Sequence, residues 1–259
     1  MNRHLIFRGL ATACFASTAL AACAPAPAAE PSTTAPLVTT PPPSLSALPS
    51  PSPSLSTSPS ATVLTSAVSA TTARGTARLA ITVMSTVEGF DDEIQGVGLT
   101  VLNAGDADLT WNSVVGQTHE ILLADDLFVQ LEPPSGAWVT VPAEEWTPTA
   151  AAGRPLRGLS DVMDVRLDGV EILDGVESTR YSGFLNLAGN GDGLGLNSRA
   201  LQLATASPSA RIAATVWIDS SGLIVQVMRT LVGATDIAAS TVTRLTDFGI
   251  AAAITAPIE

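Results

Sequence analysis

The sequence predicts a mostly β (α+β) domain: a curved, antiparallel half-barrel sheet with one or two short helices against its concave face. Apolar residues alternate with polar ones along most of the chain after residue 74, which places them on one face of a strand. Tight-turn sequences separate these runs, and segments with helical periodicity are few and short. A two-sheet sandwich is the alternative, because periodicity alone does not distinguish the two folds.

The first half of the domain predicts a meander of short strands. The opening strand runs from Ala77 to Val83, with apolar residues at every second position. Further strands are expected at 97–101, 109–111, 121–123 and 127–131. Turn residues close each run, among them Asn103–Asp106 and Pro133–Gly136. Because such strands are joined by tight turns, we expect each to pair antiparallel with the next.

The second half continues the sheet. Strands are expected at 170–173, 176–187, 212–218, 223–227, 242–248 and 251–255. Asp174-Gly175 predicts a two-residue hairpin turn, since a type I′ turn requires positive φ at both central residues. Asp219–Gly222 predicts a second reversal of the chain. The only helical signals of this region are short, around Gly158–Met163 and Ser198–Thr205.

The first 22 residues have the pattern of a secretory signal peptide. Arg3 and Arg8 precede an apolar run from Leu10 to Ala22, which is too short for a permanent membrane-spanning helix. Leu20-Ala21-Ala22-Cys23 resembles the lipobox of bacterial lipoproteins, in which the cysteine is acylated and becomes the first residue. We therefore expect residues 1–22 to be a lipoprotein signal peptide and Cys23 the lipidation site. The alternative is a soluble secreted protein with a chance cysteine at the cleavage site.

Residues 23–73 are expected to form the lipidated cysteine and a disordered linker. This segment holds 11 of the 18 prolines and otherwise consists mainly of Ser, Thr and Ala. Such a composition cannot bury enough apolar surface to offset the chain entropy lost on folding. The segment would act as a spacer that lifts the domain at 74–259 away from the membrane, and its O-glycosylation is left open.

Composition excludes several classes of function. The formal net charge is -12, so binding to nucleic acid through its phosphates is not expected. Cys14 and Cys23 are the only cysteines, and His119 is the only histidine outside the first ten residues. A disulfide framework, a Cys-ligated metal and a multi-His metal centre in the domain are thereby excluded. We expect no cofactor, no metal and no catalytic residue, and interpret His119 as an ordinary strand residue.

A series of local sequences extends the prediction to a family. In chain order they are Leu127-Phe128-Val129, Ala137–Pro142, Leu173–Tyr181, Val216–Leu223, Thr246–Gly249 and Ile254–Pro257. Together with the lipobox and linker, the chain from residue 74 to 259 resembles the LolA-like, LprG/LppX-type lipoproteins of actinobacteria. The resemblance implies a half-barrel sheet closed by helices over an apolar cavity. It also implies a non-enzymatic protein that binds or transfers acylated lipids or lipoglycans at the outer face of the cell membrane.

A cavity of this kind would be lined by apolar strand residues. The candidates for its lipid-binding wall are Leu79, Ile81, Val83, Leu99, Val101, Leu109, Ile121, Val129, Val216 and Val225. A dry, packed core accounts for the same residues. The expected partners are the membrane, through acylated Cys23, and a lipid or lipoglycan ligand. The alternative function is an envelope sensor or scaffold module that binds a protein partner without lipid cargo; an enzyme acting on cell-wall material comes third.

Overall fold

The computed structural model describes residues 59–257, except Val115, Asp125 and residues 143–151. These residues belong to one unit, Ser54–Glu259. The predicted signal peptide, Cys23 and the first part of the predicted linker lie outside the described residues. Within the described part of the chain, no helix is long and apolar enough to cross a membrane.

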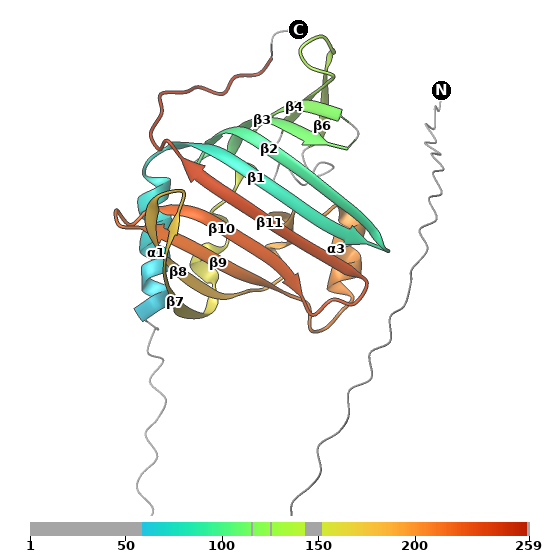
Figure 1. The fold of residues 1–259 in the computed structure, drawn as a ribbon. Helices are drawn as coiled ribbons and strands as arrows, with labels where there is room; N and C mark the ends of the chain where they lie inside the picture. Colours follow the sequence, from blue (N-terminus) through green and yellow to red (C-terminus); the bar gives the residue numbers. More distant parts are fainter. Residues whose placement is uncertain (1–58, 115, 125, 143–151, 258–259) are drawn as a thin grey trace, which may run out of the picture. The chain divides into compact units, whose positions relative to one another are not determined.

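One antiparallel sheet of eleven strands forms the framework of the domain (Figure 1). The strands are β1 (Thr76–Val87), β2 (Phe90–Val101), β3 (Asp106–Ser113), β4 (Gly116–Leu123), β5 (Asp126–Leu131), β6 (Trp138–Pro142), β7 (Met163–Leu173), β8 (Val176–Leu185), β9 (Arg211–Asp219), β10 (Ile224–Val232) and β11 (Ile237–Thr246). Their spatial order is β6-β5-β4-β3-β2-β1-β11-β10-β9-β8-β7. Two meanders are therefore joined where β1 pairs with β11, and the predicted half-barrel sheet is confirmed over the sandwich.

The turns form largely where the sequence places them. Asp174 and Gly175 both have positive φ, 50° and 84°, as the predicted type I′ hairpin between β7 and β8 requires. The Asp219 carboxylate accepts hydrogen bonds from the backbone N–H groups of Ser221 and Leu223, each at 2.9 Å. These bonds stabilise the reversal between β9 and β10.

The predicted strand at 251–255 does not form. Residues 250–257 have no regular secondary structure. The reason is topological: β11, the preceding strand, already pairs with β1 on one side and β10 on the other. A strand that follows it has no free neighbouring edge to join.

Helices α1 and α3 accompany the sheet. Helix α3 (Ser198–Thr205) coincides with the predicted one. The side chain of Asn197 caps it by accepting a hydrogen bond from the Ala200 N–H at 2.9 Å. The helix expected around 158–163 is only the short 3-10 helix η2 (Leu159–Asp161), bounded by Gly158 in a left-handed conformation and Val162 in an extended one.

Helix α1 (Pro59–Thr72) lies within the segment that the sequence assigns to the linker. Leu64, Ala67 and Thr71 follow at helical spacing and are buried, so the helix has an apolar stripe despite its Ser/Thr-rich composition. The Thr71 hydroxyl donates to the Ala67 carbonyl at 2.7 Å and accepts from the Ile224 N–H of β10 at 2.9 Å. The folded domain thus begins before residue 74, the predicted boundary.

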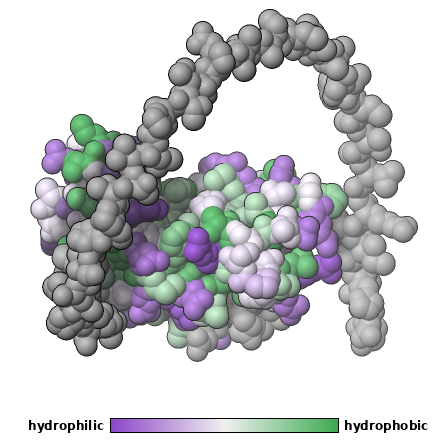
Figure 2. Space-filling view, turned by 90° about the horizontal axis from the view of Figure 1, so that it is seen from below, coloured by the Kyte–Doolittle hydropathy of each residue, from purple (hydrophilic) through white to green (hydrophobic). Residues whose placement is uncertain are grey.

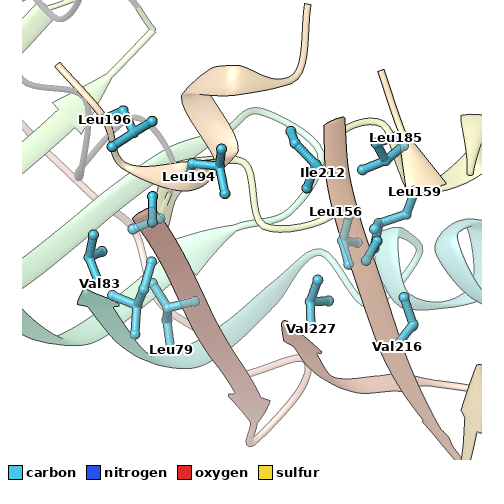
Figure 3. Close-up of a cluster of buried hydrophobic side chains, with 14 of the residues drawn as sticks. Leu79, Val83, Leu156, Leu159, Leu185, Leu194, Leu196, Ile212, Val216 and Val227 are labelled. Atoms are coloured by element: carbon cyan, nitrogen blue, oxygen red, sulfur yellow. The ribbon is translucent and has the colours of Figure 1, made fainter. Parts of the chain in front are cut away.

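The core lies between the sheet and three covering segments, which are α1, residues 152–162 and residues 186–206. Figure 3 shows Leu156, Leu159, Leu194 and Leu196 of the covering segments together with sheet residues such as Leu79 and Val216. All of them belong to one continuous cluster of buried apolar side chains. The sheet face toward this cluster is called the concave face below, and the opposite one the convex face.

Candidate functional site

The concave face is the candidate ligand-binding surface, and strand register decides which predicted wall residues belong to it. Directly paired residues of neighbouring antiparallel strands lie on the same face. The concave members are Leu79, Ile81, Val83, Leu109, Val129 and Val216. These residues come from four strands, β1, β3, β5 and β9, and belong to the buried cluster beneath the covering segments.

Three of the other four predicted wall residues lie on the opposite face. Leu99 pairs with Arg78 and Asp108, and Val101 pairs with Thr76 and Asp106, so both lie on the convex face. Ile121 pairs with Asp108 and Phe128 and lies there too. Val225 lies in the irregular step of the β9–β10 register, between Ile224 and Gln226. The assignments of Leu99, Val101 and Ile121 need correction, since alternation predicts two faces of a strand but not which one turns inward.

Glycines explain why β2 turns its apolar residues outward. Its concave positions include Gly96 and Gly98, which pair with Trp111 and Leu109. A Cβ atom at position 98 would lie 1.9 Å from the Asp108 carbonyl oxygen, and one at position 96 would lie 2.7 Å from the Trp111 ring. Both glycines are required by close approach rather than by an unusual backbone conformation.

The concave face is tightly covered in this structure. Its six predicted wall residues are only 0–4% exposed. A water-sized void beside these side chains would leave part of their surface accessible, so protein atoms fill the space around them. A bound acyl chain would therefore have to displace the covering segments.

Two open grooves lie at the ends of strands. One of about 530 Å³ is bordered by residues such as Met84, Glu93 and Ser240. Another of about 240 Å³ lies beside the β7–β8 turn and is bordered by residues such as Val176 and Phe248. Neither groove is lined by a concave member of the predicted wall. On the face seen in Figure 2, hydrophobic and hydrophilic residues are interspersed.

A buried arginine attaches the covering segment at residues 152–162 to the sheet. Arg229 of β10 is buried on the concave face, where its guanidinium donates to the carbonyl oxygens of Pro155 (2.8 Å) and Arg157 (3.0 Å). Burial lowers the pKa of Arg229 to about 10, and the nearby charge of Asp192 opposes this shift. The sequence indicates that Arg229 points inward. It comes two residues after Val227, so both side chains lie on the same face of the strand.

Further polar contacts join the same elements. The Arg157 side chain forms an ion pair with Asp192 and so links two covering segments. The Thr241 hydroxyl of β11 donates to the Gly193 carbonyl at 2.9 Å. The glycine-rich stretch around Asp192 is thus a 3-10 turn, η3 (Gly191–Leu194), which attaches a covering segment to the sheet.

A polar cluster also lies on the concave face of β3 and β4. Trp111 pairs directly with Thr118, whose hydroxyl donates to the Glu120 carboxylate at 3.1 Å. Trp111 and Glu120 are buried. The inward direction of Glu120 was not predicted, because charged residues are expected to face solvent.

His119 lies on the convex face. Its Nε2 atom is 2.7 Å from Asp108 Oδ1, and its ring meets Trp138 edge-on at 5.0 Å between centroids. Among the described residues, no hydroxyl group is hydrogen-bonded to this imidazole ring. The same residues include no group of three or more His, Cys, Asp or Glu side chains that could hold a metal ion.

Solved structures of other proteins have a similar fold. LprF from Mycobacterium bovis matches with a TM-score of 0.52 and 15% identity over 77% of this chain and 97% of that chain. The lipoprotein LppX from Mycobacterium tuberculosis matches with a TM-score of 0.49 and 15% identity over 76% of this chain and 98% of that chain. No family model and no curated protein matches the sequence. The predicted resemblance to LprG/LppX-type, LolA-like proteins is therefore confirmed at the level of the fold.

Proposed function

We propose that this protein is a membrane-anchored, extracytoplasmic lipoprotein that binds or transfers acylated lipids between the concave face of its sheet and the covering segments. The observation that carries this proposal is the apolar layer between them, which several short segments cover instead of a second sheet. Burying an acyl chain there would gain about 25 cal/mol per Å² of apolar surface.

Loading requires a closed and an open state of the covering segments. They contact the sheet through apolar side chains and a small set of polar contacts from Arg229 and Thr241. An acyl chain offers the apolar wall the same kind of contact as Leu156 or Leu194. Cargo could therefore replace the contacts of a covering segment at little net cost, which is what reversible loading requires.

Native mass spectrometry of the protein purified from its own host tests this function. We expect retained acyl species that are absent after delipidation. Val129→Trp enlarges a side chain of the packed concave layer and should abolish retention and lower the urea midpoint; Val97→Trp, on the exposed convex side of β2, should retain cargo and leave the midpoint unchanged. Absence of any acyl species in the wild type would contradict the proposal, and a folded Val129→Trp that retains cargo would exclude this part of the layer as the binding surface.

The membrane anchor is tested separately. Two or three acyl chains on Cys23 would hold the protein on a membrane durably, since each buried methylene contributes about 0.8 kcal/mol. Cys23→Ser should release the protein into the medium, as detected by fractionation. A variant that stays with the membrane fraction would exclude Cys23 as the anchor.

A second function, binding of an envelope protein, is favoured by one observation. Strand β7 is an edge of the sheet, and its Val170 and Ile172 side chains are 62% and 72% exposed. A long edge strand with exposed apolar side chains can accept a strand from a partner. Val170→Lys should then reduce crosslinking to a partner in intact cells without changing the acyl species retained.

A further inference from the structure

The groove of about 530 Å³ lies on the convex face and has a mainly apolar surface. Met84 of β1 lines it, is 41% exposed, and pairs with Glu93 of β2 and Ser240 of β11. Val114, at the end of β3, borders it and is 89% exposed. Between these side chains the surface is hollow, because the neighbouring convex residues are small: Thr86, Thr230, Ala238 and Ser240.

An adjacent groove extends this surface along β1. It has a volume of about 370 Å³ and is bordered by the next convex residues of β1, Ala80 and Thr82, and by Val97 of β2, which is 53% exposed. The two grooves together follow β1 from Ala80 to Thr86, a length of about 20 Å at 3.3 Å per residue. Exposed apolar side chains along a surface of this length are typical of an interaction site.

The β2 side of the larger groove is acidic. Asp91 and Glu93 pair directly with convex residues of β1, so their carboxylates lie on the convex face, and Asp92 borders the same groove. Asp91 and Glu93 each accept a hydrogen bond from a neutral side chain, at 2.6 Å and 2.9 Å. None of the three carboxylates forms an ion pair with any residue that the structure describes. No arginine of this part of the chain therefore neutralises the groove by direct contact.

Charge selects the occupant of this apolar groove. The Pro-rich segment of the same chain does not fit, because Glu30 is the only charged residue from 24 to 73. A second copy has the same formal net charge of -12 and is repelled, and an anionic lipid surface is repelled as well. A basic segment of another protein is attracted to the carboxylates, and its apolar side chains can cover Met84 and Val114.

We infer that the convex groove binds a basic segment of a partner protein, with Lys or Arg side chains beside Asp91 and Glu93 and an apolar side chain on Met84. The inference goes beyond lipid binding, since the groove lies on the opposite face of the sheet from the apolar layer. It also differs from strand addition at β7. Strand β1 pairs with a strand on each side, so a partner contacts this groove through side chains rather than as a further strand.

Peptide binding to the purified protein tests the inference. The probes are a fluorescein-labelled peptide of three lysines followed by Val-Leu-Val, and the same peptide with glutamates in place of the lysines. Fluorescence anisotropy should show binding of the lysine peptide only. Glu93→Gln should weaken this binding by about two- to fivefold, the effect of one solvent-exposed ion pair. Met84→Ser should weaken it too, because an apolar contact is lost.

Glu177→Gln is the matched control. It removes the same charge from an exposed position of β8 that does not border the groove, and it should leave binding unchanged. Equal weakening by Glu93→Gln and Glu177→Gln would mean that net charge alone attracts the peptide, which overturns the inference. Binding of the glutamate peptide, or failure of the lysine peptide to bind, overturns it as well. A dimer in sedimentation velocity that Met84→Ser dissociates would assign the groove to a second copy instead.

Discussion

Replacing one leucine on each face of the sheet tests whether the concave layer is packed. Leu109 is 0% exposed and belongs to the central cluster, whereas Leu99, on the neighbouring strand, lies partly buried on the convex face. Both were candidates for one wall, and the register separates them. Leu109→Ala and Leu99→Ala remove the same atoms from the two sides of the sheet.

The expected costs differ because only one site leaves a cavity. Truncating a fully buried leucine costs about 2–5 kcal/mol, which combines the lost transfer free energy with a term for the cavity left behind. For Leu109→Ala we expect about 3 kcal/mol, a decrease of about 6–12 °C in Tm for a domain of this size. For Leu99→Ala we expect less than about 1.5 kcal/mol, since its site is already open to water on one side.

Urea denaturation followed by circular dichroism and tryptophan fluorescence measures both values. The m-value should be the same for wild type and both variants, so that the shift in midpoint reports stability alone. Equal losses for the two variants would contradict the assignment of faces. A loss below about 1 kcal/mol for Leu109→Ala would show that its surroundings are hollow rather than packed.

Three further substitutions test how the elements are attached. Thr71→Val removes the hydroxyl that accepts from the Ile224 N–H; it should cost about 1–3 kcal/mol and speed hydrogen exchange in α1, whereas Thr71→Ser should not. Gly98→Ala should cost more than about 3 kcal/mol or prevent folding, because its Cβ would lie 1.9 Å from the Asp108 carbonyl oxygen, and unchanged stability would refute this register. Arg229→Met should speed exchange in residues 152–162. Because burial lowers the pKa of Arg229 to about 10, the unfolded chain binds more protons than the folded one above this pH. The wild type should therefore gain stability relative to this variant between pH 8 and pH 11, as the difference between their urea midpoints would show.

Much of the domain follows from local sequence. The alternation in β1 and the Asp174-Gly175 turn predict their elements because strand periodicity and positive φ are local properties. Helix α3 was equally predictable, with Asn197 as its cap. Helix α1 was missed because its composition resembles the linker before it, and only the spacing of Leu64, Ala67 and Thr71 distinguishes the two.

The site depends more on contacts between distant residues. Leu99 and Leu109 have the same pattern in sequence, but the pairing of β2 with β3 places them on opposite faces. The polar cluster around Trp111 likewise forms only when Gly96 and Thr118 are brought beside it. A sequence pattern cannot contain this information, since it depends on which strand lies next to which.

By itself, the sequence determined the class of this protein: a mostly β domain, an acidic composition, and a lipobox-like start followed by a Pro-rich segment. These are properties of residue type and short-range spacing. The tertiary structure alone decided which apolar residues face the covering segments, that this layer is closed, and that Arg229, Trp111 and Glu120 lie within it. The physical reason is that register and burial arise from long-range pairing, which turns one alternating pattern into two chemically different faces.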